Sequence, residues 1–244
     1  MADTGSYELG LSETQCHAAE TESAGPQEFE LLGLRWELLP GVFAPFHSRS
    51  TESYTSWLPL HSGDSFLEMG CGAGVTAVYA ALAHGHRTTA LDVSAAAVEN
   101  TQVNAARHGV PDRVDARQSD MFDALDPQER FDIIFWNSSA IPAPASFTYT
   151  RDIEWSIFDR DYESHRRYLQ EGPRYLTERG RLFLGFNTNG DVERLQELAA
   201  ESGLHLREIQ SRTTTYDGQT TARFMLLELL PARTTAAPVP ETLR

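Results

Sequence analysis

The chain contains no lysine and only two cysteines. All 20 basic residues among its 244 are arginine. A pyridoxal phosphate enzyme forms its internal Schiff base on a lysine, and a Walker-type phosphate loop and a protein kinase each need one, so these three classes are excluded. Cys16 and Cys71 cannot supply a disulfide framework, a four-thiolate zinc site or an iron–sulfur cluster.

Long apolar runs and a secretion signal are also missing. No run approaches the roughly 18 apolar residues of a membrane span. The first ten residues, MADTGSYELG, have neither a basic flank nor an apolar core. We therefore expect a cytoplasmic protein with no membrane partner. Hydrophobic residues make up 41% of the chain and charged residues 23%, which is typical of a globular domain.

Positive charge is scarce as well. The chain has 35 acidic and 20 basic residues, which gives a formal net charge of −15. A polyanion gains nothing from the neutralisation of phosphates that dominates nucleic-acid affinity. The seven arginines of residues 151–181 are balanced by seven acidic residues, which indicates a solvated, self-paired surface. We therefore expect a small-molecule substrate and no nucleic-acid partner, with monomer and homodimer both left open.

The composition divides the chain into four parts. Residues 1–27 are acidic and lack apolar periodicity, so we expect a flexible, dispensable tail. Residues 28–62 contain a hairpin pattern and a short helix, and are expected to cover the active site. Residues 63–230 form the expected catalytic domain, and residues 231–244 a second flexible tail.

Strand and helix patterns alternate through the expected catalytic domain. Strands are predicted at 65–69, 87–93, 113–118, 131–136 and 181–186, and helices at 75–84, 94–109, 162–177 and 191–202. Residues 204–211 and 221–230 read as a closing hairpin, and 138–160 as irregular. This alternation predicts an α/β, Rossmann-like fold with a mostly parallel seven-stranded sheet, a C-terminal antiparallel hairpin and a small N-terminal extension.

The strongest motif is FLEMGCGAG at residues 66–74. Gly70, Gly72 and Gly74 stand at the predicted turn from a strand into a helix. Glycines there allow positive φ angles and a close approach of the backbone to a ligand. A nicotinamide fingerprint would need a glycine three residues after Gly72, where Val75 stands.

Acidic residues accompany this loop at successive strand ends. Glu68 precedes the glycines, Asp92 ends the next predicted strand, and Asp120 ends the third. This arrangement resembles the S-adenosylmethionine (SAM) site of class I methyltransferases. The resemblance implies that Glu68 faces the methionine end of SAM, that Asp92 binds the ribose, and that Asp120 binds the adenine edge with the Met121 amide. The full set that it assigns to SAM is Glu68, Gly70, Gly72, Asp92, Val93, Asp120, Met121 and Asn137.

The fourth predicted strand continues into FDIIFWNSSAIPAP, residues 131–144. Its Asn137 resembles the first residue of the Asn-Pro-Pro-aromatic motif of HemK-like and other amino-group methyltransferases. Residues 41–54 (GVFAPFHSRSTESY) and 159–169 (DRDYESHRRYL) also resemble that group. In those enzymes the Asn side chain and the next carbonyl hold a planar nitrogen. Ser138, Ser139 and Ala140 replace the rest of the motif, so methylation of a glutamine amide is not expected.

Transfer from SAM requires an aligned nucleophile and the exclusion of water, and it needs no metal. We assign Asn137, Ser138 and Tyr162 as the candidate catalytic residues. Asn137 can accept a hydrogen bond from an amine, and an aromatic ring can stabilise the sulfonium. His47 is the candidate general base. The candidate substrate-binding residues are Phe46, His47, Arg49, Trp136, Ser139, Trp155 and Thr188.

Three functions remain open from the sequence. The first is methyl transfer from SAM to a small polar acceptor, such as an amino acid or a secondary metabolite. The second is cyclisation of SAM itself to azetidine-2-carboxylate or aminocyclopropane carboxylate with release of methylthioadenosine, as in azetidine-2-carboxylate synthases related to the HemK-like enzymes. The third is a SAM-binding regulator without catalysis.

Overall fold

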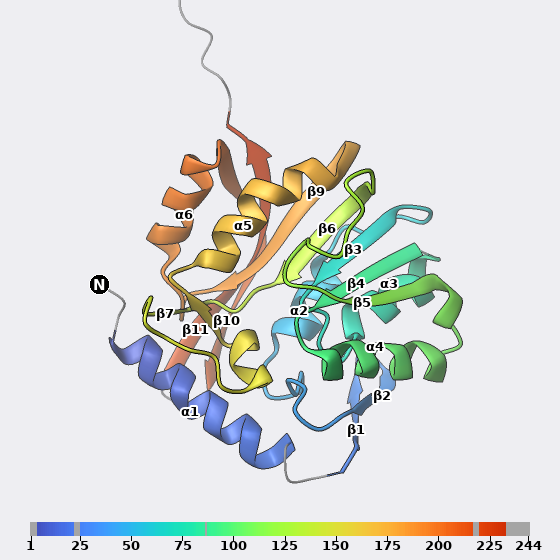
Figure 1. Ribbon diagram of the computed structural model, residues 1–244, viewed down its shortest axis with the longest axis horizontal. Coiled ribbons are helices and arrows are strands. Elements are labelled where there is room, and N and C mark those ends of the chain that lie inside the picture. The colour runs from blue at the N-terminus through green and yellow to red at the C-terminus, as the bar shows by residue number, and fades with distance from the viewer. Residues whose placement is uncertain (1–3, 22–24, 86, 217–219, 233–244) are drawn as a thin grey trace, which may run out of the picture.

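A seven-stranded sheet forms the centre of the computed structural model, which describes residues 4–21, 25–85, 87–216 and 220–232 (Figure 1). Its strands are β3 (Ser65–Met69), β4 (Arg87–Asp92), β5 (Val114–Gln118), β6 (Phe131–Asn137), β9 (Leu176–Asn187), β10 (Leu204–Tyr216) and β11 (Thr220–Pro231). They lie in the order β10-β11-β9-β6-β3-β4-β5. The five strands from β9 to β5 are parallel, and β11 runs antiparallel to both β9 and β10. The predicted fold class is confirmed.

Helices cover both faces of this sheet. On one face lie α2 (Ser50–Trp57), α3 (Val75–His84) and α4 (Ala95–Arg107), and on the other α5 (Glu163–Glu171) and α6 (Val192–Glu201) (Figure 1). Short 3-10 turns occupy η1 (Pro111–Arg113), η2 (Asp152–Ser156) and η3 (Gly172–Tyr175). The central strand β6 is almost continuously apolar because helices cover it on both sides. In the described part of the chain, no helix is both long and apolar enough to cross a membrane.

The helix ends follow local side-chain chemistry. Ser94 caps α4, and its Oγ accepts the Ala97 N–H at 3.4 Å. Neither Ser50 nor Thr51 caps α2, because the Ser48 Oγ accepts the Ser50 N–H from outside the helix at 3.2 Å. The helix predicted over 162–177 is shorter in the structure and continues as the η3 turn, which contains a proline.

The hairpin predicted within residues 28–39 is present as β1 (Gln27–Leu31) and β2 (Leu34–Leu38). Two asparagines of α4 hold it in place. The Asn104 Oδ1 accepts the Glu37 N–H at 2.8 Å, and the Asn100 Oδ1 accepts the Leu39 N–H at 2.9 Å. Asn104 also donates to the Ala73 carbonyl at 2.8 Å. One helix therefore fixes both the hairpin and the glycine loop.

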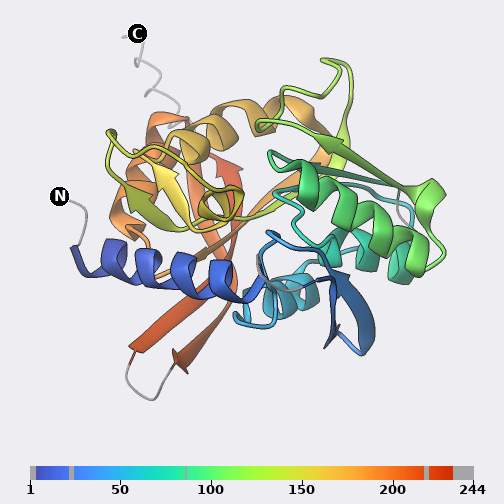
Figure 2. The same cartoon turned by 60° about the horizontal axis from the view of Figure 1, so that its bottom comes forward.

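The prediction of an unstructured tail over residues 1–27 is wrong for α1 (Thr4–Thr21). This helix lies beside β7 (Ile141–Ala143) and β8 (Phe158–Arg160), which form a small parallel sheet in the segment predicted to be irregular (Figures 1 and 2). The Tyr7 ring lies 5.4 Å from the Phe158 ring. Gly10 approaches so closely that a Cβ on it would lie 2.5 Å from the Phe158 ring.

The predicted C-terminal tail is only partly described. Pro231 ends β11 instead of beginning a tail, and residues 233–244 lie outside the described residues. The boundary between the covering segment 28–62 and the catalytic domain 63–230 stays a prediction.

Gly74 joins the glycine loop to α4. Its φ is +77°, and a Cβ on it would lie 2.8 Å from the Thr101 Cα. A side chain at this position would therefore be strained by the left-handed backbone and would also collide with a helix backbone. Gly33, in the turn between β1 and β2, has a similar φ of +73° but no protein atom within 4 Å of its would-be Cβ.

These two glycines separate the cost of the backbone angle from the cost of the collision. We expect Gly33→Ala to lower the free energy of unfolding by about 1–2 kcal/mol, because only the left-handed angle is penalised. Gly74→Ala should cost that amount and about 1–3 kcal/mol more, because α4 must shift. Urea unfolding of the two variants measures the difference. Equal losses would show that the loop does not depend on its close approach to Thr101.

Candidate functional site

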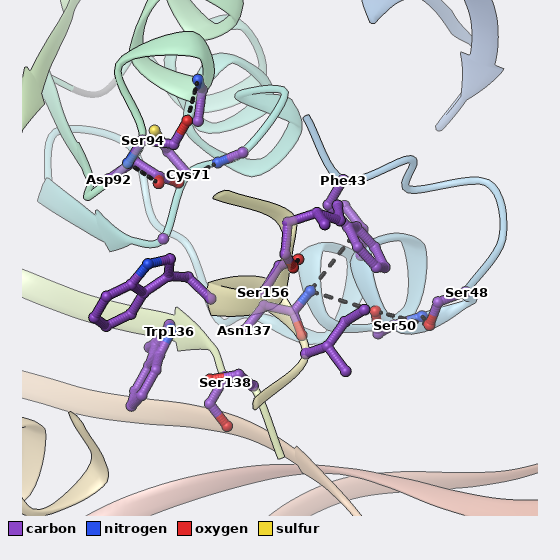
Figure 3. A pocket seen from close by; sticks show the side chains of 18 of the residues that line it. Phe43, Ser48, Ser50, Cys71, Asp92, Ser94, Trp136, Asn137, Ser138 and Ser156 are labelled. Atoms are coloured by element: carbon purple, nitrogen blue, oxygen red, sulfur yellow. Dashed lines mark hydrogen bonds between the residues drawn. The ribbon is translucent and has the colours of Figure 1, made fainter. Parts of the chain in front are cut away.

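A cavity of about 360 Å³ lies at the carboxyl ends of β3, β4 and β6, where ligands bind in open α/β sheets (Figure 3). Its lining comes from the glycine loop, these strand ends, residues 41–51, the η2 turn and α1. In Figure 3, Asp92 and Ser94 lie on one side, Phe43 and Ser50 on the other, and Asn137 between them. Among the described residues, no group of three or more His, Cys, Asp or Glu side chains could hold a metal ion.

Asp92 links the glycine loop to the end of β4. Its Oδ2 accepts the Gly72 N–H and its Oδ1 accepts the Ser94 N–H, both at 2.9 Å. Burial raises the pKa of Asp92, while these amide donors act against the rise. Each carboxylate oxygen keeps a second lone pair that can accept a ligand hydroxyl. A Cβ on Gly72 would meet no protein atom within 4 Å, so a ligand can approach this backbone closely.

Glu68 lies deeper, between β3 and α3. Its Oε2 accepts the Ala77 N–H in the first turn of α3 at 2.8 Å. Burial raises the pKa of Glu68 to about 8, so the side chain is mostly a neutral acid at pH 7. Glu68 lines the cavity with Gly70, and its predicted position at the methionine end of SAM stays a prediction.

Asp120 and Met121, the residues predicted to bind adenine, line the cavity, and so does Val93 from the set predicted to bind SAM. The exposed Asp120 carboxylate pairs with Arg167 of α5 at 3.1 Å. Met121 has a φ of +49°, and its carbonyl accepts the Ser119 hydroxyl at 2.7 Å. This turn brings Met121 to the cavity lining. Adenine binding by Asp120 and Met121 stays a prediction.

Asn137 ends β6 beside α2. Its Nδ2 lies within donating distance of the Ser50 Oγ, at 3.3 Å, and of the Thr51 Oγ1, at 3.5 Å (Figure 3). Within the described residues, no hydrogen bond to its side-chain oxygen is found. The orientation therefore offers a carbonyl oxygen to a ligand donor. Trp136 and Ser139, on either side in sequence, also line the cavity.

Ser138 lines the cavity and begins a buried polar chain. Its Oγ lies 3.0 Å from the His165 Nε2, and the His165 Nδ1 lies 2.6 Å from the Asp159 Oδ2. The sequence patterns do not reveal His165 and Asp159, although both lie in the segment 159–169 quoted for its resemblance. His165 is 27 residues from Ser138, and this separation gives no sign of contact without the fold.

Tyr162 is not a cavity residue, which corrects its assignment as catalytic. The ring is buried. Its hydroxyl donates to the Ala140 carbonyl at 2.8 Å and accepts the Asp191 N–H at 2.7 Å. Burial raises the pKa of Tyr162. Because both contacts are to the backbone, its role is to join the start of α5 to the start of α6.

Three predicted substrate-binding residues also lie outside the cavity lining. Phe46 is exposed and packs against the ring of His47. Arg49 points to the surface. Thr188 accepts the Arg223 N–H at 3.0 Å, which pairs the ends of β9 and β11. Each faces solvent or a neighbouring strand, so none of the three substrate assignments is supported.

His47 and Trp155 line the cavity, and their contact with a substrate stays a prediction. Three cavity residues that sequence analysis missed come from α1: Leu9, Glu13 and Cys16. Burial raises the pKa of Glu13. No signal in the sequence could reveal them, because the helix contacts the molecule through few side chains and shows no apolar stripe.

Comparison with known proteins identifies the family. Residues 60–216, more than half of the chain, match the family model described as "Methyltransferase domain". The chain is 27% identical to the 27-O-demethylrifamycin SV methyltransferase of Amycolatopsis mediterranei, over 66% of this chain and 58% of that protein. It is 32% identical to ribosomal RNA small subunit methyltransferase C of Alcanivorax borkumensis, over 61% of this chain and 41% of that protein. It is 34% identical to the release factor glutamine methyltransferase of Bordetella pertussis, over 44% and 40%. The chain thus spans between 40 and 58% of the length of these relatives.

Solved structures show the same fold. The ribosomal protein L11 methylase of Lactobacillus delbrueckii subsp. bulgaricus matches with a TM-score of 0.55 at 16% identity, over 80% of this chain and 84% of that one. The tRNA m1G37 methyltransferase of M. jannaschii matches with a TM-score of 0.60 at 13% identity, over 87% of this chain and 58% of that one. At these identities the similarity shows the fold alone.

These relatives overturn the exclusion of nucleic acid that was drawn from net charge. Proteins named for the methylation of ribosomal and transfer RNA are among the matches. Net charge is a property of the whole chain and does not report the potential in one cleft. The cyclase alternative gains no support from the comparisons.

The family match covers the strand–glycine loop–helix unit and the carboxyl ends of β4 and β6, which form one part of the cavity lining. The chain therefore belongs to the methyltransferase domain family, whose members catalyse SAM-dependent methyl transfer.

Proposed function

We propose that this chain transfers the methyl group of SAM to a nitrogen or oxygen atom of a small polar molecule, bound between Asn137 and α1. The observation that carries the proposal is the shared cavity. Leu9, Glu13 and Cys16 of α1 line the same space as the glycine loop and Asn137. A helix across the opening limits the size of an acceptor that can enter, and it excludes water from the reacting atoms.

The residues on the β3–β4 side fit SAM. Asp92 offers two carboxylate oxygens for the ribose hydroxyls, and Gly72 offers an open backbone surface. Val93, Asp120, Met121, Glu68 and Gly70 line the same cavity, and in this proposal Asp120 and Met121 contact the adenine and Glu68 the methionine end. When bound, SAM supplies an electrophilic methyl carbon on a sulfonium.

The residues on the β6 side fit the acceptor. The side-chain oxygen of Asn137 can accept a hydrogen bond from an acceptor N–H or O–H and so aim its lone pair. Ser139, His47 and Trp155 add a hydroxyl, an imidazole and an aromatic face to this part of the lining. Glu13 adds a carboxyl group to the lining.

The relative from Amycolatopsis mediterranei supports a small acceptor, since its name refers to a rifamycin and its match covers 66% of this chain. Other relatives are named for RNA and protein substrates, so the experiment also tests RNA and protein as acceptors.

The experiment compares acceptor classes with and without α1. The full chain and a variant lacking residues 1–24 are incubated with methyl-labelled SAM and, separately, the twenty amino acids, 27-O-demethylrifamycin SV, 16S ribosomal RNA and a release-factor protein. We expect labelled small molecules from the full chain and at least tenfold less from the truncated variant, because water enters the opened site. Gly10→Leu is the full-length counterpart, since its side chain would push α1 away from Phe158.

Two outcomes would contradict the proposal. One is labelling of RNA or protein but of no small molecule. The other is formation of methylthioadenosine from SAM alone, which would indicate cyclisation. Melting curves of each variant establish that the sheet is intact.

Asp92 carries a prediction about SAM affinity. Asp92→Ala removes charge-assisted hydrogen bonds worth about 1.5–3 kcal/mol each, so the dissociation constant for SAM should rise at least tenfold. Asp115→Ala is the matched control, because Asp115 lies on the adjacent strand β5, pairs with Arg117 and does not line the cavity. Calorimetry measures the SAM affinity of both variants. Equal SAM affinities would show that Asp92 does not bind the ribose.

Asn137 carries a prediction about turnover. Asn137→Asp is nearly isosteric and places a carboxylate where an amide stood. The added charge favours the protonated, unreactive form of an amine acceptor, so turnover should fall at least tenfold while SAM affinity changes much less. Parental turnover in this variant would mean that Asn137 does not position the nucleophile.

A further inference from the structure

A buried chain of three polar side chains runs away from the acceptor side of the cavity. It leads from the Ser138 Oγ to the His165 Nε2 at 3.0 Å, and from the His165 Nδ1 to the Asp159 Oδ2 at 2.6 Å. Ser138 is 8% exposed, His165 0% and Asp159 1%. Ser138 alone of the three lines the cavity, so it connects the buried pair to the place proposed for the acceptor.

Asp159 fixes the tautomer of His165. Its Oδ1 accepts the Ser164 N–H at 3.0 Å, and its Oδ2 accepts the His165 backbone N–H at 2.9 Å at the start of α5. These contacts hold the carboxylate in one orientation against the His165 ring. Because a carboxylate only accepts, the Nδ1 carries the proton between them. In the neutral ring the Nε2 is therefore an acceptor, to which the Ser138 hydroxyl can donate.

The Gly185 carbonyl gives the Ser138 hydroxyl a second partner, at 2.9 Å. When the His165 Nε2 gains a proton, it donates to the Ser138 Oγ, and the hydroxyl turns toward Gly185. This carbonyl also accepts the Ser138 backbone N–H at 3.1 Å, so it has a partner in either state. The polar side-chain atoms of Ser138, His165 and Asp159 can therefore all be hydrogen-bonded before and after protonation of His165. Neither protonation state leaves one of these buried atoms without a partner.

Aromatic rings surround the imidazole. The Trp136 ring of β6 lies 4.7 Å from it, the Phe186 ring of β9 lies 5.5 Å away, and the Tyr162 ring lies 4.9 Å away. Among the described residues, the titratable groups in contact with the His165 ring are Asp159 from β8 and Tyr162, the residue before α5. The residues that β6 and β9 contribute, Trp136, Ser138 and Phe186, do not titrate near neutral pH. An imidazolium formed here would lie against the Asp159 carboxylate and beside the Trp136 ring.

We propose that Ser138, His165 and Asp159 form a proton relay that takes the proton of the acceptor nucleophile, an inference that rests on the proposed function. The acceptor N–H or O–H proton passes to the Ser138 Oγ as the Ser138 hydroxyl proton passes to the His165 Nε2. The electron pair left on the acceptor forms the bond to the methyl carbon, and the pair of the broken methyl–sulfur bond stays on sulfur. The imidazolium returns its proton to solvent through Ser138 after the product leaves.

In this relay Ser138 is the catalytic residue, since it touches the acceptor. His165 accepts the proton through Ser138, and Asp159 positions His165. The relay selects acceptors that are neutral and must lose a proton on methylation, such as hydroxyl groups and free amines, over acceptors that are already anionic.

Nitrogen NMR of the ¹⁵N-labelled full chain tests the protonation states without any acceptor. The His165→Gln spectrum identifies the His165 signals among the eight histidines. We expect a neutral form with the proton on Nδ1 and an unprotonated Nε2, protonation of Nε2 when the ring becomes charged in acid, and a shift of the Nε2 signal in Ser138→Ala. An Nε2–H neutral tautomer, or an Nε2 that stays protonated throughout, would overturn the relay.

A kinetic experiment uses the acceptor identified among the candidate acceptors tested above, which are called the panel here. His165→Gln and Ser138→Ala should each lower the single-turnover rate of methyl transfer about a hundredfold or more and flatten its pH dependence, with little change in SAM affinity. His108→Gln is the matched control, because the His108 ring packs on Trp36 at 4.6 Å and does not line the cavity. It should react like the parent.

The two arms fail in different ways. A parental rate in His165→Gln would overturn the relay and leave methyl transfer standing. If the panel yields no methylated product, the proposed function fails, and the NMR titration still decides whether Ser138, His165 and Asp159 exchange a proton as described.

Discussion

The close contact between the glycine loop and α4 is the constraint on which the site depends. Gly74 packs on the Thr101 backbone at a distance that no side chain permits. The Thr101 hydroxyl also donates to the Gly72 carbonyl at 3.2 Å, and Asn104 donates to Ala73. With Asp92 accepting the Gly72 N–H, the loop is held from two sides. The floor of the cavity is therefore set by backbone geometry, which gives a preorganised surface for a ligand.

The acceptor side of the cavity is built in a different way. It is formed by side chains from elements that lie far apart in the sequence, including α1, the segment before α2, the end of β6 and the η2 turn. These elements meet through ring contacts such as Tyr7 on Phe158, and not through a continuous sheet. The family fold explains the floor, and it leaves the acceptor to be decided by this second set of residues. The relatives named for rifamycin, RNA and protein substrates share the methyltransferase domain but differ in the acceptor, as this separation of the cavity into two parts would allow.

Local patterns explain what the sequence could predict. Strand β6 is visible as an apolar run, the helix start at Ser94 as a capping residue, and the loop at Gly72 as a spacing of glycines. Helix α1 was missed because its contact uses a glycine and one tyrosine instead of an apolar stripe. Tyr162 was assigned to catalysis because it is an aromatic near the cleft, but backbone groups occupy its hydroxyl.

The turn after Asn137 shows how a departure from a motif can carry its own chemistry. In the HemK-like pattern a proline follows the asparagine, and a proline has neither a backbone N–H nor a hydroxyl. At that position Ser138 uses both groups. Its N–H donates to the Gly185 carbonyl of β9, and its Oγ reaches His165. The second partner, His165, is in turn held by Asp159. The serine therefore replaces a rigid turn by a hydrogen-bonded one and connects the cavity to a buried imidazole, a link that the proline of the motif could not make.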